Sequence, residues 1–147
     1  MSATAVRAAK QDVADVLVRY AASIDRRDWE RLVTCFTDPC DVEYEGAGAW
    51  TSPADMAAFM TDAHASMGHT LHRLATIDVA VDDALDRARA RSYVDAVLMA
   101  PDGLSGINSV GWYDDELVPV DDGWRIARRR FTAVRLLVIG AEGDLLH

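Results

Sequence analysis

The sequence predicts an α+β fold in which three helices come first and a strongly curved antiparallel sheet follows. Two observations predict this order. Apolar residues recur at helical spacing before residue 36 and again after residue 52, and four long stretches rich in strand-forming residues, separated by turns, follow Gly68. Helices gathered at one end of the chain can close one side of a curved sheet. We therefore expect one domain over residues 1–147 that encloses a pocket.

Three helices are expected. The first covers residues 4–25, and its apolar stripe consists of Val13, Val16, Leu17, Tyr20, Ala21 and Ile24. A second, short helix should run over residues 29–36 and stop before Asp38-Pro39. A third should begin after Ser52-Pro53, where a serine cap, a proline in the first turn and an acid three residues after the cap stand together, and should end near Gly68.

The strands follow from alternation and turn residues. Asp41 to Tyr44 should form a short strand that turns at Gly46 and Gly48 and pairs with a strand containing Trp50. Four long strands in meander order are then expected over Thr70–Val81, Arg87–Met99, Gly106–Leu117 and Trp124–Ile139. Residues 84–91 favour a helix by propensity, but the alternation of Ala and Arg there favours a strand.

Composition excludes several classes of protein. Twenty-four acidic and fifteen basic residues give a net charge of -9, which opposes binding to nucleic acid or to an anionic membrane surface. The longest apolar runs reach five residues, far short of the roughly 20 that span a bilayer. The first thirty residues lack the apolar core of a signal peptide, so we expect a cytoplasmic protein. Cys35 and Cys40 are expected to be buried, reduced residues.

Asp25 and Tyr20 are the first candidate functional residues. Asp25 lies at the expected end of the first helix, where the helix dipole disfavours a negative charge. Either Arg26 and Arg27 compensate this charge and the side chain caps a loop, or Asp25 faces the pocket and holds a partner. Tyr20 lies in the apolar stripe, so its hydroxyl either finds a partner in the core or faces a cavity.

Three of the four histidines, His64, His69 and His72, lie within nine residues. We expect no metal site, because His69 and His72 would point to opposite faces of a strand and no Glu or Cys completes a zinc spacing. A histidine in a long strand is often structural. Asp25 would instead make His72 a general base, because a carboxylate fixes the imidazole tautomer and stabilises the imidazolium.

Asp95, in the apolar centre of an expected strand, and Arg129, in the last one, are two further candidates. Asp95 faces either solvent or a polar pocket, since burying an unpaired carboxylate is costly. Alternation places Arg129 on one strand face and Arg128 and Arg130 on the other. Both faces carry apolar neighbours, so a salt-bridged surface cluster and a pocket arginine both remain open.

Several motifs, in this order of elements, resemble one known family over nearly the whole chain. They are Tyr20-Ala-Ala-Ser-Ile-Asp25, Asp28-Trp29-Glu30-Arg31-Leu32 with Phe36, Thr70-Leu71-His72, Ala88-Arg89-Ala90-Arg91-Ser92-Tyr93 and Gly123-Trp124-Arg125-Ile126. The family is the SnoaL-like branch of the cone-shaped, nuclear-transport-factor-2-like superfamily. It includes polyketide cyclases, scytalone dehydratase, hexachlorocyclohexane dehydrochlorinase and bile acid 7α-dehydratases, and non-catalytic proteins share its scaffold.

The resemblance implies a set of catalytic residues. In the dehydratase and dehydrochlorinase members, an aspartate that ends the first helix pairs with a histidine that starts the first long strand, and these positions match Asp25 and His72. A tyrosine and a strand acid of the bile acid dehydratases match Tyr20 and Asp95, and an arginine in the last strand of several members matches Arg129. Scytalone dehydratase uses a second histidine in a later strand, which this chain lacks.

The resemblance also implies a reaction. We expect a cofactor-independent dehydratase or related lyase that acts on a hydrophobic cyclic, polyketide- or steroid-like, small molecule. Asp95, Trp50, Phe59 and Tyr113 are expected to contact the substrate. The same groups would suit a polyketide cyclase or a double-bond isomerase, because all three reactions begin with one proton abstraction. A non-catalytic ligand-binding or dimerising module of the same fold is the alternative from another class.

The segment Ala133 to Ile139 is more apolar than a free edge strand tolerates. We therefore expect it to be covered by another subunit or folded over the pocket mouth. A homo-oligomer is expected on this basis, and the resemblance implies a dimer or a trimer.

Overall fold

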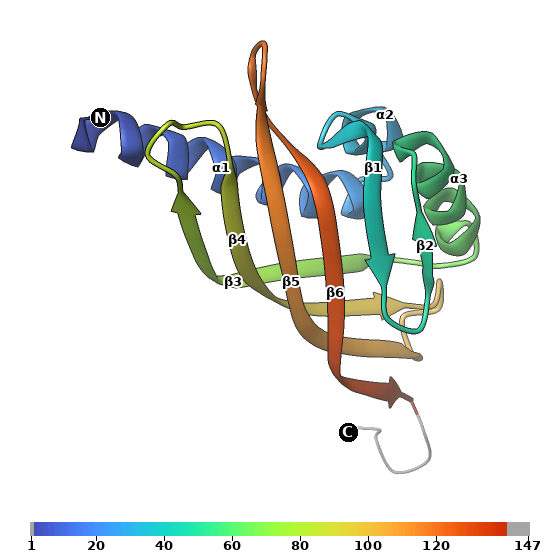
Figure 1. Cartoon of the computed structure of the whole chain (residues 1–147). Helices are drawn as coiled ribbons and strands as arrows, with labels where there is room; N and C mark the ends of the chain where they lie inside the picture. Colours follow the sequence, from blue (N-terminus) through green and yellow to red (C-terminus); the bar gives the residue numbers. More distant parts are fainter. Residues whose placement is uncertain (1, 141–147) are drawn as a thin grey trace.

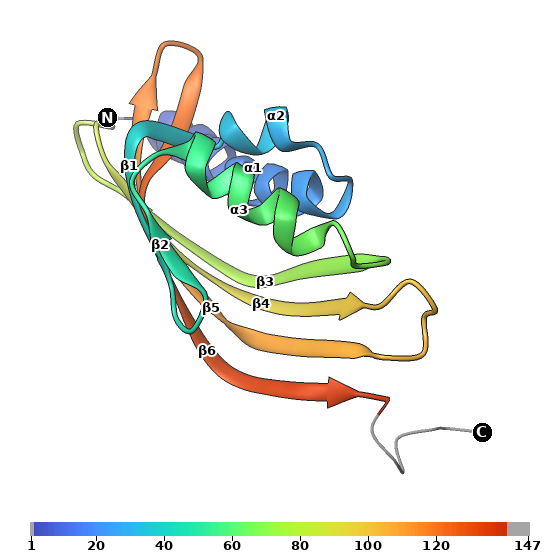
Figure 2. The same cartoon turned by 90° about the vertical axis from the view of Figure 1, so that its right-hand side faces the viewer.

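Three helices lie on the concave side of one six-stranded sheet that curls strongly without closing (Figures 1 and 2). The computed structural model describes residues 2–140. The helices are α1 (Ala3–Asp25), α2 (Trp29–Val33) and α3 (Pro53–His64). The strands are β1 (Phe36–Tyr44), β2 (Gly48–Trp50), β3 (Thr70–Val81), β4 (Ala88–Met99), β5 (Gly106–Val120) and β6 (Gly123–Ile139). The α+β class, the helix-first order and the four long strands are confirmed.

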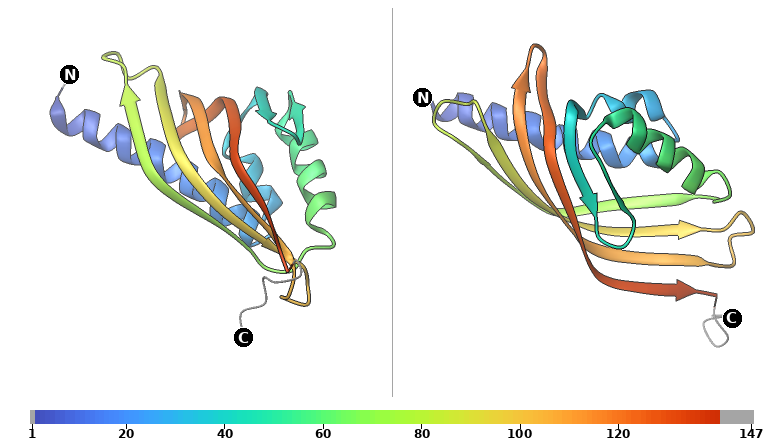
Figure 3. Two further views of the ribbon diagram at one scale, coloured as in Figure 1. Left: turned by 90° about the horizontal axis from the view of Figure 1, so that it is seen from below. Right: turned by 45° about the vertical axis from the view of Figure 1, so that its right-hand side comes forward.

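The long helix α1 runs across the concave face, against β3 and β6 (Figure 3). Ser2 caps its first turn by accepting a hydrogen bond from the backbone N–H of Ala5 at 3.0 Å. The predicted apolar stripe is buried in full. No helix among residues 2–140 is long and apolar enough to cross a membrane.

The two shorter helices end earlier than predicted. Helix α2 ends at Val33, and Phe36 is the first residue of β1 instead of the last of a helix. Pro39 does not end a helix but lies within β1, where the pairing with β6 shifts register between Phe36 and Asp41. Helix α3 has the predicted cap, since Ser52 accepts from the N–H of Asp55 at 3.2 Å, but it ends at His64 and not near Gly68.

The sheet has the order β2-β1-β6-β5-β4-β3. The meander from β3 to β6 is antiparallel as predicted, and β2 pairs with β1 through Trp50. The prediction of a wholly antiparallel sheet was wrong, because β1 pairs with β6 in parallel and the sheet is mixed. Strand alternation predicts which residues form strands, but it contains no information on a pairing between segments almost ninety residues apart.

An extra residue in β6 decides which side chains enter the core. The register passes from Leu117 opposite Ile126 to Glu116 opposite Arg128, which leaves Ala127 as a bulge. Ile126 and Arg129 are therefore both buried against the helices, with 0% of each exposed. Strict alternation places them on opposite faces, which is the reason the sequence could not settle the position of the arginine.

The last part of β6 is exposed. Strand β1 ends at Tyr44, opposite Phe131, so residues 132–139 of β6 pair with β5 alone and form a sheet edge. Leu136 and Val138 are 62% and 65% exposed in the single chain. The expectation that another subunit covers this segment stays a prediction.

Candidate functional site

Asp25 and His72 form a hydrogen-bonded pair where the end of α1 meets the start of β3. Oδ1 of Asp25 lies 2.7 Å from Nδ1 of His72, and Oδ2 accepts the backbone N–H of His72 at 2.8 Å. The hydroxyl of Thr70 lies 3.0 Å from Oδ1. The side chains of His72 and Asp25 are 10% and 21% exposed, so the pair is largely sheltered but reachable from the concave side.

The pair can act as a general base. Burial raises the pKa of Asp25, but the hydrogen bonds from the ring and backbone of His72 and from Thr70 outweigh it and hold that pKa below its usual value. An ionised carboxylate only accepts hydrogen bonds, so Nδ1 of His72 is the donor, and in the neutral ring this leaves the lone pair on Nε2. Nε2 makes no hydrogen bond with any residue in the range 2–140 and is available to a substrate.

The register of the sheet gives His72 its neighbours on the concave face. His72 lies opposite Ala96, Ala96 opposite Ser109, and Ser109 opposite Leu136. Directly opposed residues share a face, so these four side chains form one row across β3, β4, β5 and β6. Leu136 is 62% exposed, so the row runs from the sheltered base to an open edge. We call this row on the concave side of the sheet the concave trough, and it ends at the exposed edge of β6. The enclosed cavity that we expected stays a prediction.

Arg129 lies in the core beside the middle of α1. Its Nε and Nη2 donate to the two carboxylate oxygens of Asp115 at 2.7 and 2.9 Å, and both side chains are at most 1% exposed. Its guanidinium stacks on the rings of Tyr113 and Tyr20, at 3.9 and 4.3 Å from the ring centroids. Although burial opposes it, the carboxylate of Asp115 raises the pKa of Arg129 well above its ordinary value, so the arginine is charged.

The tyrosines complete this closed cluster. The hydroxyls of Tyr20 and Tyr44 are hydrogen-bonded to each other, and Nη1 of Arg129 donates to Tyr44 at 3.4 Å. Burial raises the pKa of Tyr20 well above its usual value, so the phenol is neutral. Tyr20, Tyr113 and Arg129 are thus paired with one another and with Asp115 inside the core. The structure places these three side chains in the core, and a contact with substrate stays a prediction.

Trp50 and Phe59 lie together at the rim of the concave side. Their ring centroids are 4.9 Å apart, and Phe59 is 38% exposed. Tyr44 packs edge-on against Trp50 at 5.6 Å and lies 5.9 Å from Tyr113, so the aromatic contacts continue from this rim into the core. The two rim rings are the members of the predicted substrate-contacting set that remain accessible from this side.

Asp95 lies on the other face of the sheet. It is opposite Arg73, while its neighbour Ala96 is opposite His72, so Asp95 and His72 point to opposite sides. The carboxylate is 50% exposed, pairs with Arg73 at 3.1 Å and accepts from Asn108 at 2.7 Å. Asp95 therefore does not lie beside His72 and is partly exposed to solvent, and a contact of Asp95 with substrate stays a prediction.

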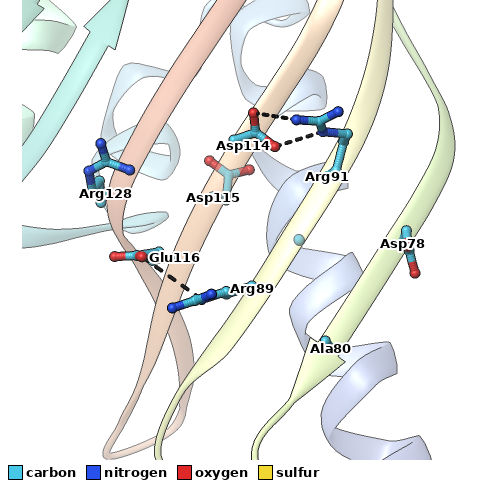
Figure 4. A pocket seen from close by; sticks show the side chains of 9 residues that line it. Asp78, Ala80, Arg89, Arg91, Asp114, Asp115, Glu116 and Arg128 are labelled. Atoms are coloured by element: carbon cyan, nitrogen blue, oxygen red, sulfur yellow. Dashed lines mark hydrogen bonds and ion pairs between the residues drawn. The ribbon is translucent and has the colours of Figure 1, made fainter.

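The convex face carries ion pairs between neighbouring strands. Figure 4 shows a shallow groove there, in which Arg91 of β4 pairs with Asp114 of β5 at 2.8 Å and Arg89 faces Glu116 at 4.0 Å. Neither residue of the Asp25–His72 pair lines this groove. Among residues 2–140, no three His, Cys, Asp or Glu side chains are grouped so that they could hold a metal ion.

Comparison with known families agrees with this architecture. The sequence profile of the SnoaL-like domain family matches residues 6–130, which includes every element up to the first half of β6. The chain belongs to the SnoaL-like domain family. The matched residues 6–130 include both Asp25 and His72.

Individual relatives of this SnoaL-like domain are distant. An uncharacterized protein of Mycobacterium tuberculosis is 26% identical over 119 residues, which cover 80% of each chain. A proposed scytalone dehydratase from Novosphingobium aromaticivorans is 20% identical, with a TM-score of 0.78 over 86% of this chain and 85% of that chain. The hexachlorocyclohexane dehydrochlorinase LinA-type3 from Novosphingobium barchaimii is 17% identical, with a TM-score of 0.76 over 94% and 92%. The two structures establish the common nuclear-transport-factor-2-like fold.

Sequence reasoning missed several residues of the SnoaL-like domain that shape the site. Asp115, the partner of Arg129, has a detectable signal, because alternation puts it on the same face as Tyr113 and Leu117. An acid between two inward-facing apolar residues requires a buried cation. For Arg27 the sequence indicates only a charge that compensates Asp25. No local pattern predicts that its side chain reaches Thr70.

Proposed function

We propose that this protein is a cofactor-independent dehydratase or related lyase that acts on a hydrophobic cyclic small molecule with a polyketide- or steroid-like ring. The observation that carries the proposal is the Asp25–His72 pair, with Nδ1 held by the carboxylate and Nε2 open to the concave trough. A dehydratase and a dehydrochlorinase among the structural relatives are named for eliminations, which supports this class of reaction.

His72 is the general base of the proposed reaction. Its Nε2 takes a proton from a carbon next to a carbonyl group, and the electron pair of that C–H bond becomes an enolate. The enolate then expels a hydroxyl group from the next carbon, and a carbon–carbon double bond forms. The imidazolium returns its proton to the departing hydroxyl, which leaves as water. The step is redox-neutral and needs no further reactant.

The row across the sheet suggests the size of the substrate. Two strand spacings, or about 10 Å, separate His72 from Ser109. A ring lying over Ala96 would place its acidic carbon at Nε2 and an oxygen at the hydroxyl of Ser109, which can donate to a developing enolate. Leu98 and Ile107 lie opposite each other one row away and supply an apolar floor.

Arg129 and Tyr20 support the site from within the core in this proposal, without touching the substrate. Their cluster packs against the part of α1 that precedes Asp25, and it fixes where that helix lies on the sheet. The same filled core favours a second candidate function, a non-catalytic ligand-binding module, because it leaves the trough as the open space beside the dyad.

Conversion of β-hydroxy ketones tests the proposal. The protein is incubated with a panel of cyclic β-hydroxy ketones of one to four rings, and mass spectrometry measures loss of water. We expect turnover by the wild type and by His69→Ala, whose histidine is exposed in the same segment, and none by His72→Ala. Isomerisation or cyclisation without loss of water would favour the isomerase or cyclase. Ligand binding with no conversion by any variant would favour the binding module.

A further inference from the structure

Arg27 connects the end of α1 to the start of β3. Its backbone is left-handed, with φ 58°, which turns the chain back immediately after the helix. From there the side chain donates to the carbonyl of Ile24 at 2.9 Å, to the carbonyl of Gly68 at 2.7 Å and to the hydroxyl oxygen of Thr70 at 2.8 Å. One guanidinium thus joins the helix end, the loop before β3 and the strand that carries His72.

The hydrogen bonds from Arg27 through Thr70 to Asp25 can run in one direction only. A guanidinium has donors and no acceptor, so the oxygen of Thr70 accepts from Arg27. The single proton of the Thr70 hydroxyl is then directed to Oδ1 of Asp25, 3.0 Å away, because an ionised carboxylate only accepts. Oδ1 receives the ring proton of His72 on its other side, at 2.7 Å. Two side chains, Thr70 and His72, therefore donate to one carboxylate oxygen, and Arg27 sets the direction of the Thr70 hydroxyl.

We propose that Arg27, acting through the Thr70 hydroxyl, is a positioning residue that locks Asp25 in the orientation that keeps the proton of His72 on Nδ1 and leaves Nε2 as the base. The role of this lock in turnover rests on the proposed function. The lock itself does not, because the tautomer of His72 is a property of the free protein.

The hydrogen-bonded series Arg27–Thr70–Asp25–His72 joins α1 to β3 and also affects the tautomer of His72. Thr70 is 3% exposed, so its hydroxyl has no water to replace Arg27 as the donor to its oxygen. Without that donor, the hydroxyl is free to rotate and donate elsewhere, and Oδ1 loses one of its two side-chain donors. The ring of His72 can then adopt the Nε2–H tautomer, which is the favoured form of neutral histidine in water and cannot take a proton at Nε2.

Nuclear magnetic resonance of the ring nitrogens tests the lock directly. Long-range proton–nitrogen correlation spectra of the full-length protein are recorded at a pH where the imidazole is neutral, and His72→Gln identifies the His72 signals. We expect the wild type to show the Nδ1–H form. Thr70→Val, which keeps the shape of the side chain and removes the hydroxyl, should shift the tautomer ratio about 10-fold toward Nε2–H. Thr70→Ser should restore the wild-type ratio.

Arginine variants provide the second arm of this experiment. Arg27→Met should shift the tautomer ratio in the same direction as Thr70→Val. Its matched control is Arg26→Met, because Arg26 is exposed and makes no side-chain hydrogen bond with residues 2–140. Circular dichroism and thermal melting report whether each variant folds. If Arg27→Met does not fold, Thr70→Val decides the outcome alone.

Kinetics separates this inference from the proposed function. With a converted substrate in hand, Thr70→Val should lower kcat about 10-fold and leave KM nearly unchanged, whereas a merely structural role would lower the folded fraction and leave kcat per folded molecule intact. If Thr70→Val shifts the tautomer ratio as expected but the wild type converts no substrate, the proposed function is wrong and the lock is retained. Wild-type tautomer ratios in a folded Thr70→Val protein would overturn the lock.

Discussion

Asp25 holds His72 by two hydrogen bonds at once. Oδ1 lies 2.7 Å from the ring Nδ1, and Oδ2 accepts the backbone N–H at 2.8 Å. The second bond ties the carboxylate to the main chain of β3, so the carboxylate cannot swing away when the ring gains or loses a proton. The ring is thereby fixed in both rotation and tautomer, which is the arrangement that a general base requires.

Asp25→Asn should leave the fold intact and abolish most of the activity. The amide has nearly the shape of the carboxylate, but it can donate to Nδ1, which favours the Nε2–H tautomer and removes the lone pair at Nε2. We expect kcat to fall about 10²- to 10⁴-fold, the usual contribution of a positioned base. Steady-state kinetics measures the effect, with Asp12→Asn on the exposed side of α1 as the control. A variant that retains wild-type kcat would exclude the dyad mechanism.

The sequence predicts the Asp25–His72 pair because both residues stand at the ends of well-marked elements. The helical stripe ends at Asp25, the alternation of β3 begins beside Gly68, and the family resemblance links the two positions. That the helix end meets the strand start is what the family resemblance implies, and the order of elements alone does not give it.

The remainder of the site depends on features without a local signal. Ala127 is one unpaired residue in β6, and that single insertion turns Arg129 inward beside Ile126. The parallel pairing of β1 with β6 and the reach of Arg27 to Thr70 are likewise set by tertiary packing. Alternation therefore left the place of Arg129 open, and the family resemblance named the residue without its buried partner Asp115.

His64 should make the protein less stable below neutral pH. It is 6% exposed, its Nδ1 lies 2.7 Å from the carbonyl of Met60, and its buried Nε2 has no hydrogen-bond partner among residues 2–140. Burial lowers its pKa below the ordinary value, so the unfolded chain binds a proton more readily than the folded one. The contribution of neutral His64 to stability is thus complete above its unfolded pKa of about 6.5. It is lost as the pH falls through the pKa of His64 in the folded protein.

His64→Phe tests this pH dependence. Phenylalanine keeps a ring against Trp29, whose centroid lies 5.6 Å from that of His64, and cannot titrate. Urea unfolding at pH 7.5 and 5.5 should show a smaller loss of stability on acidification than in the wild type. His69→Gln, at an exposed position, should retain the wild-type loss. An unchanged pH dependence in His64→Phe would show that another group is responsible.

Breaking the buried Arg129–Asp115 pair should strongly destabilise the fold. Asp115→Ala leaves the guanidinium uncompensated among aromatic rings, and removing one partner of such a pair typically costs about 3 to 5 kcal/mol. The double variant Asp115→Ala with Arg129→Met removes both charges and should lose less stability than the sum of the single variants Asp115→Ala and Arg129→Met. Urea unfolding of all variants completes the cycle. Near-wild-type stability of Asp115→Ala would contradict the described pairing.

The exposed end of β6 should make the protein an oligomer. Leu136 and Val138 are 62% and 65% exposed in the single chain, and covering each such side chain is worth roughly 1.5 to 3 kcal/mol. Sedimentation equilibrium at micromolar concentration should therefore detect a dimer or a trimer. Leu136→Asp should shift it toward monomer, because an aspartate buried in the interface would be unpaired. Val18→Asp, at a 51% exposed position on α1, should not. A wild type that sediments as a monomer would leave this apolar edge exposed in solution and contradict the prediction.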